Sequence, residues 1–138
     1  MKRKVDIHKA AGIIIRNRKL LVERSKGKEF FIAPGGSIES GETAEQALVR
    51  ELKEEFRIDT TETDFDFFGT FYAEAAGQEE RWLQSDIFIV KTWKGEPTPD
   101  NEVEMIDWIT SDNPKGHKIG SIFEHEVMPR LKARGLID

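Results

Sequence analysis

The sequence contains no cysteine, which excludes disulfide bonds, thiolate nucleophiles and cysteine-based zinc sites. It has no apolar run near the roughly 18 residues of a membrane span, and the apolar segment 10–15, interrupted by Gly12, is too short for a signal peptide. An excess of positive charge is also missing: 21 Lys and Arg stand against 26 Asp and Glu, a net charge of −5. Such a chain repels phosphates unless a cation mediates. We therefore expect a cytoplasmic protein that binds neither a membrane nor a nucleic acid polymer.

The chain is long enough for one hydrophobic core and leaves little for a second. It has 138 residues, of which 38% are hydrophobic. It contains no internal repeat, and the segment richest in Pro and Gly, residues 94–101, is short. We predict a single domain over residues 1–138. The sequence does not indicate the oligomeric state.

Short apolar and alternating segments predict several β-strands. A polar turn at 17–19 joins the first two strands, Pro34 ends the third, and a second polar turn is predicted at 77–80. The predicted strands cover residues 11–16, 20–23, 30–33, 65–75, 87–90 and 103–109. In the strand at 65–75, a period of two predicts one buried face that carries Phe65, Phe67 and Phe71.

Two helices are predicted, one in the middle of the chain and one near its end. Residues 43–56 show apolar side chains at helical spacing, and Thr43 with Gln46 matches a capping box. Residues 121–134 predict the closing helix, with Pro129 as either a kink or a fresh start. A mixed sheet with a helix on each side follows.

The middle helix carries three carboxylates on one face. At about 100° per residue, Glu51, Glu54 and Glu55 fall at i, i+3 and i+4, beside the apolar side of the helix. A Glu-rich face is usually only solvated, but like charges so close to a core destabilise the helix unless something compensates. Clustered oxygen ligands suit a hard divalent cation, Mg²⁺ or Mn²⁺. Such a cation would also mediate the binding of an anionic ligand.

The loop before this helix has the glycine spacing of a phosphate-binding P-loop. Gly36 and Gly41 are separated by four residues, yet Glu42 stands where that motif needs a lysine, and a carboxylate repels phosphate. We therefore reject the P-loop interpretation. Glu42 is predicted to pair with Arg50 and to hold the loop against the helix.

These residues together resemble the Nudix box. Gly36, five residues, Glu42, seven residues and then Arg50-Glu-Leu-Lys-Glu-Glu-Phe-Arg-Ile58 match its pattern, and the similarity to MutT-like members extends over nearly the whole chain. The resemblance implies an α/β fold, the Nudix-type α/β/α sandwich with a mixed β-sheet flanked by helices. It also implies that metal-activated water cleaves a diphosphate bond in a nucleoside diphosphate linked to another group.

The resemblance further implies a set of site residues. Arg50 would orient a glutamate, and an acid from a later loop would act as an extra metal ligand or general base. The best match for that acid is Glu102, six residues before Trp108, and Glu104 is second. The implied catalytic residues are Arg50, Glu51, Glu54 and Glu102. The implied ligands of Mg²⁺, or of Mn²⁺, are the main-chain carbonyl of Gly35 and the side chains of Glu51, Glu54, Glu55 and Glu102.

Arg57 departs from the family pattern, since a glycine normally ends the box. Either the chain accepts a left-handed non-glycine residue, at about 1–2 kcal/mol, or the helix ends differently. The histidines, His8, His117 and His125, show no ligand spacing and are assigned no role. Five aromatic residues could stack on a base but are more often part of a core: Phe31, Tyr72, Trp82, Trp93 and Trp108.

We expect a small-molecule nucleotide as substrate. A nucleoside triphosphate, such as an oxidised purine triphosphate, is favoured by family likeness. The alternatives are a hydrolase of ADP-ribose, a nucleotide sugar or a dinucleoside polyphosphate, and, from another class, a non-catalytic module that binds nucleotide as a sensor. The complete set of glutamates weighs against the sensor. The residues that bind the substrate's nucleoside are not assigned.

Overall fold

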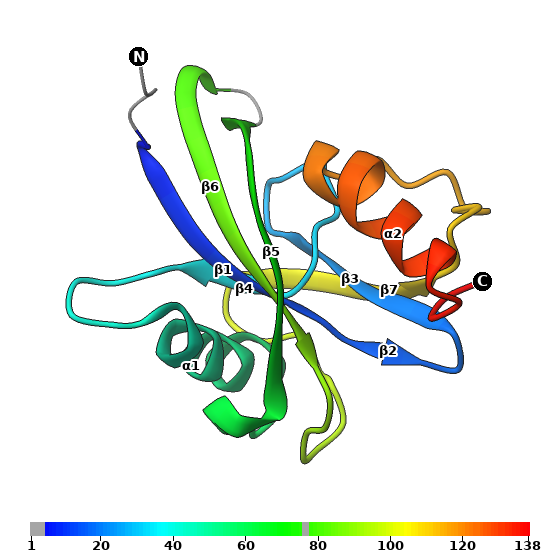
Figure 1. The fold of residues 1–138 in the computed structure, drawn as a ribbon, viewed down its shortest axis with the longest axis horizontal. Helices are drawn as coiled ribbons and strands as arrows, with labels where there is room; N and C mark the ends of the chain where they lie inside the picture. The colour runs from blue at the N-terminus through cyan, green and yellow to red at the C-terminus, as the bar shows by residue number, and fades with distance from the viewer. Residues whose placement is uncertain (1–4, 76–77) are drawn as a thin grey trace.

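The computed structural model describes residues 5–75 and 78–138, whose strands form two sheets (Figure 1). The first sheet has the order β4-β1-β6-β5 and is mixed, because β1 runs parallel to β6 and antiparallel to β4. The second sheet is antiparallel and has the order β2-β3-β7. The strands are β1 (Ile7–Ile13), β2 (Ile15–Arg16), β3 (Lys19–Ser25), β4 (Gly35–Ser37), β5 (Phe65–Ala75), β6 (Gln78–Val90) and β7 (Val103–Ile109).

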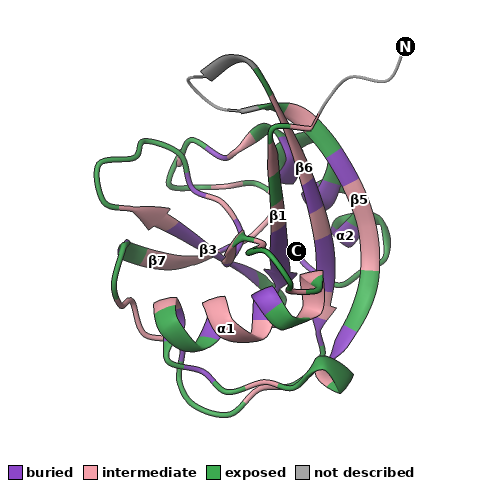
Figure 2. Ribbon diagram, turned by 90° about the vertical axis from the view of Figure 1, so that its left-hand side faces the viewer, coloured by how far each residue is buried: buried purple, intermediate pink, exposed green. Residues whose placement is uncertain are grey.

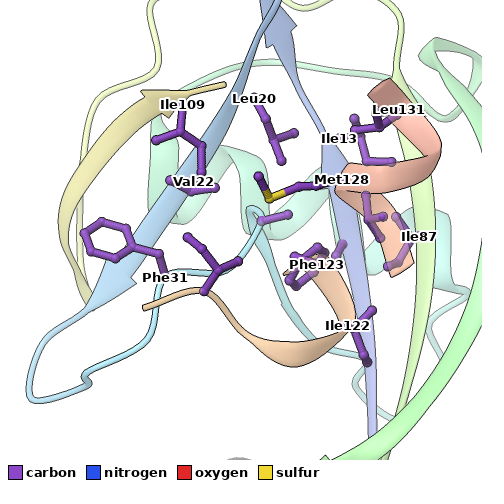
Figure 3. Packing of buried hydrophobic residues seen from close by; sticks show 14 of the residues in the cluster. Ile13, Leu20, Val22, Phe31, Ile87, Ile109, Ile122, Phe123, Met128 and Leu131 are labelled. Carbon is purple, nitrogen blue, oxygen red and sulfur yellow. The ribbon is translucent and has the colours of Figure 1, made fainter. Parts of the chain in front are cut away.

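Helical segments cover the strands from two sides (Figure 1). Helix α1 (Ala44–Phe56) lies on one side, and its buried face packs with one apolar cluster of the strands (Figure 2). On the other side, the π-helical turn η2 (Phe123–Val127) continues into helix α2 (Met128–Ala133). Their apolar side chains pack with Ile13, Leu20 and Val22 in a second cluster (Figure 3). The predicted fold class, a mixed sheet between helices, is confirmed.

Helix α1 begins and ends where the sequence predicts. Thr43 is the N-cap: its hydroxyl accepts a hydrogen bond from the Gln46 amide, and the Gln46 side chain accepts one from the Thr43 amide. The helix ends at Arg57, which has φ 57° and ψ 30°. The chain therefore accepts a left-handed arginine in place of the glycine of the family pattern. A short 3₁₀ turn, η1 (Glu62–Asp64), then leads into β5.

The strand predicted at 30–33 is wrong. Only isolated bridges occur there, from Ile32 to Glu23 and from Phe31 to Ile119. The strand forms after Pro34 instead, where β4 pairs with β1. Glycine makes this possible, because a Cβ on Gly35 would lie 2.1 Å from the carbonyl oxygen of the opposite strand.

The buried face predicted for β5 is only partly correct. Phe65 and Phe71 are buried, but Phe67 is 64% exposed. The pairing of β5 with β6 shifts register between Phe67 and Gly69, and this irregularity changes the alternation of the two faces. A period of two cannot be extended through such a shift.

The predicted turns at 17–19 and 77–80 and the closing helix differ in part from the structure. Asn17 and Arg18, both with positive φ, form the first turn, and Lys19 already belongs to β3. Of the turn predicted at 77–80, Gly77 lies outside the described residues, and the rest is wrong because β6 begins at Gln78. Pro129 lies in the first turn of α2, but residues 121–133 are helical without a break, so it does not start a separate helix; the irregularity is the π-helical turn η2 just before it.

Within residues 5–75 and 78–138, no helix has the length and apolar character needed to cross a bilayer.

Candidate active site

The carboxylate of Glu51 lies directly above the backbone of Gly36. Helix α1 packs on β4 here, so closely that a Cβ on Gly36 would lie 2.4 Å from the Glu51 Cδ atom. Any side chain larger than hydrogen at position 36 would therefore displace the carboxylate. The glycine of the loop thus has a steric role in placing a glutamate of the helix.

Arg50 holds this glutamate in position. Its Nη1 donates to Glu51 Oε1 at 2.8 Å, while Nε and Nη2 donate to both carboxylate oxygens of Glu42 at 2.8 and 2.9 Å. Nη2 also donates to the carbonyl oxygen of Ser37 at 3.1 Å. The hydrogen bond from Arg50 lowers the pKa of Glu42 to about 2. The predicted pairing of Glu42 with Arg50 is confirmed, and Arg50 also hydrogen-bonds to Glu51.

A loop ahead of β7 is docked on the carboxyl end of α1. The amide of Asp100 donates to the carbonyl oxygen of Glu55 at 2.9 Å, and Asn101 Nδ2 donates to that of Glu54 at 2.6 Å. The Arg57 guanidinium donates to Asp100 Oδ2 at 3.0 Å. These bonds satisfy carbonyl groups that a helix end otherwise leaves open. They also bring the following residue, Glu102, against the helix.

Glu102 contacts Glu55 through its backbone. Its amide donates to Glu55 Oε2 at 3.1 Å, and its side chain is exposed beside this contact. Glu104, the second candidate from the sequence, accepts a hydrogen bond from Arg24 Nη1 at 2.9 Å. Of the two acids, Glu102 is the one that lies against the carboxylates of α1. Gly35, the source of the implied carbonyl ligand, lies in β4 beside Gly36.

Burial and neighbouring charges act on two acids of the site, Glu51 and Glu55. Burial raises the pKa of Glu51 and of Glu55 above the ordinary value, and neighbouring carboxylates, Glu54 among them, raise both further. In the part of the chain that the structure describes, no group of three or more His, Asp and Glu side chains is placed to hold a metal ion as it stands. Arg50 Nη1 lies 2.8 Å from the Glu51 carboxylate and 3.5 Å from that of Glu54. The donor atoms are all oxygens, as a hard divalent cation requires.

A cavity of about 380 Å³ lies next to Gly36, the glycine that Glu51 contacts, and the described residues that line it do not include Glu51, Glu54, Glu55 or Glu102. Gly35 and Gly36 line its wall near Glu51, and residues 120–123, which lead into η2, line another part of it. The cavity also holds Glu23, a buried residue of β3 to which the sequence analysis gave no role. The one signal in the sequence is an acid directly after the apolar run Leu20–Val22.

The comparison with protein families decides the class of this protein. A family model described as NUDIX domain matches residues 6–131. The chain belongs to the Nudix family. As a Nudix hydrolase it acts on a diphosphate bond in a nucleoside diphosphate that is linked to another group. Nudix hydrolases generally use divalent metals.

Individual Nudix proteins resemble this chain to different extents. An 8-oxo-dGTP diphosphatase of Proteus vulgaris is 36% identical over 100 residues, which cover 69% of this chain and 85% of that protein. An ADP-ribose pyrophosphatase of Methanocaldococcus jannaschii is 49% identical over 47 residues, which cover 32% of this chain and 28% of that protein. The crystal structure of the MutT protein from Methanosarcina mazei Go1 has a TM-score of 0.76 at 17% identity and covers 98% of this chain and 99% of that one, which shows a shared fold.

Within the described part of the chain, none of the histidines and none of the five singled-out aromatic residues lines the cavity. His8 contacts Asp86 at 2.6 Å, and His117 contacts Asp107 at 2.8 Å while its ring lies 4.1 Å from that of Phe31. Phe31 is buried in the core, as expected, whereas Tyr72 is 53% exposed and does not belong to the core. The aromatic residues that line the cavity in the described part of the chain are Phe30 and Phe123, which the sequence analysis did not single out.

Proposed function

We propose that this Nudix hydrolase cleaves a nucleoside triphosphate, with an oxidised purine triphosphate as the favoured substrate. The observation that carries the proposal is the position of Glu51, which Arg50 and Gly36 hold at the edge of a cavity large enough for a nucleoside. The relative from Proteus vulgaris, which is named for 8-oxo-dGTP, supports the choice of substrate. The diphosphate would lie near the carboxylates and the nucleoside in the cavity.

The proposed cofactor is Mg²⁺, with Mn²⁺ as the second choice. Its ligands would be the side chains of Glu51, Glu54, Glu55 and Glu102 and the carbonyl oxygen of Gly35. The all-oxygen donor set supports this choice, as do crowded carboxylates whose charges a cation would balance. When bound, such a cation neutralises charge on the phosphate oxygens and lowers the pKa of the attacking water.

The protein's own residues orient and assist this chemistry. Arg50 fixes the rotamer of Glu51 through a charge-assisted hydrogen bond and is itself fixed by Glu42. The loop that docks on the end of α1 keeps Glu102 beside Glu55, where its carboxylate would serve as a further metal ligand or would take a proton from water. No covalent nucleophile is needed, because phosphoryl transfer to water asks mainly for charge stabilisation and alignment.

Turnover measurements test the proposal. The purified protein is incubated with Mg²⁺ and a panel of nucleoside triphosphates, 8-oxo-dGTP, ADP-ribose, nucleotide sugars and dinucleoside polyphosphates, and the products are identified by chromatography. We expect the triphosphates to be cleaved fastest. Glu54→Gln and Glu55→Gln should abolish activity and weaken metal binding while the thermal melting stays cooperative. Glu62→Gln, at an exposed position of η1, is the matched control. Wild-type rates in both site variants would refute the assignment.

The same panel separates the alternative functions. The match to the ADP-ribose pyrophosphatase of Methanocaldococcus jannaschii supports ADP-ribose as the second candidate substrate. Preferential cleavage of ADP-ribose would replace our proposal with that activity. Nucleotide binding without turnover of any compound in the panel would instead indicate a sensor module.

A further inference from the structure

Glu23 is a carboxyl group buried without adequate partners. The residue is 3% exposed, and the described residues provide its side chain with a single long hydrogen bond, from the Ser25 hydroxyl at 3.4 Å. Buried carboxyl groups are normally satisfied by several hydrogen bonds or by an ion pair. The exception at Glu23 calls for an explanation, because an apolar residue at this position would avoid the cost of burying the charge.

The carboxyl group belongs to the wall of the 380 Å³ cavity, so a ligand there can reach it. The surroundings are mostly apolar, with Ile32, Leu83 and Phe123 among the lining residues. Small-molecule sites commonly combine apolar walls with a few polar groups that fix the orientation of the ligand. A planar nucleobase matches such walls, and its polar edge then needs a partner.

We propose that Glu23 is a specificity-determining residue that accepts a hydrogen bond from the exocyclic amino group of the substrate's nucleobase. This inference rests on the proposed function and adds the class of base to it. A carboxyl group has an acceptor oxygen whether or not it is protonated, so both forms bind an amino group. A base that presents a carbonyl oxygen in place of the amino group meets an acceptor instead of a donor. The same rule makes glutamate a partner of the cytosine amino group in DNA recognition.

The groups around Glu23 agree with this role. Burial is the main reason that its pKa rises to about 7, and the charges of Glu55 and Glu51 raise it further, while the Ser25 hydroxyl and Lys9 lower it. A carboxyl group that holds a proton near neutral pH can donate to a ring nitrogen while it accepts from the amino group. An ionised one accepts from the ring N–H and amino group of guanine.

Paired nucleotides that differ at the amino group test the inference. Guanosine and inosine nucleotides differ by that group alone, and the cytidine and uridine pair provides a second comparison. We expect wild-type protein to favour GTP over ITP in kcat/KM, and GMP over IMP in calorimetric binding, by about tenfold or more. Glu23→Met should bring both ratios close to one. Glu23→Gln keeps an acceptor oxygen and should retain part of the preference, and Glu62→Gln should leave the ratios unchanged.

The outcomes separate this inference from the proposed function. Equal binding of GMP and IMP by the wild type, or a ratio that Glu23→Met leaves intact, overturns the inference even when triphosphates are cleaved. A uniform loss with all four bases also overturns it, because Glu23 would then act at the phosphate end. Selective binding of GMP that depends on Glu23, without turnover, supports the inference and removes the proposed function. Thermal melting tests whether each variant is folded. If Glu23→Met does not fold, the comparison is made with Glu23→Gln.

Discussion

Gly36 and Glu51 fit against each other with no room for a methyl group. The glycine lies in β4 and the glutamate in α1, and a Cβ on the glycine would lie within 2.8 Å of the carboxylate carbon and both of its oxygens. This contact explains why the loop needs glycine at a position where no phosphate-binding turn is formed. It makes the position of the glutamate depend on the packing of a helix against a strand.

Gly36→Ala should therefore reduce activity without unfolding the protein. The added methyl group forces Glu51 out of its place, and a misplacement of about 1 Å can cost about 10²-fold in rate. The measurement is kcat/KM under the conditions that give the best wild-type turnover, together with thermal melting. Gly116→Ala is the control for an alanine without a steric contact, since no atom lies within 4 Å of the added Cβ; its φ of 68° adds a backbone strain that position 36 does not have, and thermal melting measures that strain. Equal activity in Gly36→Ala and wild type would contradict the role of the contact.

Arg50→Lys should lower kcat/KM by about 10- to 100-fold, the usual range for a residue that orients a metal ligand. Lysine keeps the positive charge but cannot donate at once to Glu42, Glu51 and the Ser37 carbonyl group. Steady-state kinetics and a metal titration measure the effect. Lys53→Arg, an exposed basic residue on the same helix, serves as the control. If Arg50→Lys keeps wild-type kinetics, the positive charge at position 50 is sufficient, and the orientation of Glu51 by the guanidinium group is not required.

Arg57→Gly should be more stable than Arg57→Ala by about 1 kcal/mol. Both variants lose the ion pair with Asp100, but only alanine keeps a side chain in the left-handed conformation that ends α1. Urea unfolding of the two variants measures this difference directly. A glycine variant that is less stable than the alanine variant would show that the helix end is not strained.

Glu23→Met should change how stability depends on pH. The folded-state pKa of Glu23 is raised from 4.5 to about 7, so the folded protein retains a proton that the unfolded chain releases. Relative to the methionine variant, the wild type therefore loses stability as the pH rises from about 4.5 to about 7, and the loss then levels off. The shift corresponds to about 3 kcal/mol. Unfolding free energies of both proteins from about pH 4 to about pH 8, without divalent metal, measure it. Parallel curves would contradict the raised pKa.

The sequence was sufficient to predict helix α1 and the pairing of Glu42 with Arg50. A capping box is a contact between residues three positions apart, and the charged residues of the box lie within one turn of helix or one loop of each other. The left-handed Arg57 was one of two predicted outcomes, and the choice required the backbone itself. The missed strand at β4 and the exposed Phe67 have another cause, because strand pairing and a shift in register depend on partners far along the chain.

The amino-acid sequence by itself determined the Nudix family, the acidic face of α1 and the likeness that points to a divalent metal, because these depend on residue types at short, fixed spacings. Only the tertiary structure decided that Gly36 makes room for Glu51, that the Glu102 amide meets Glu55, and that Glu23 lies in a cavity. Each of these contacts joins segments that are separated in the chain, so the path of the backbone and the packing of the core set them. The spacing of residues in a sequence carries no record of such distances.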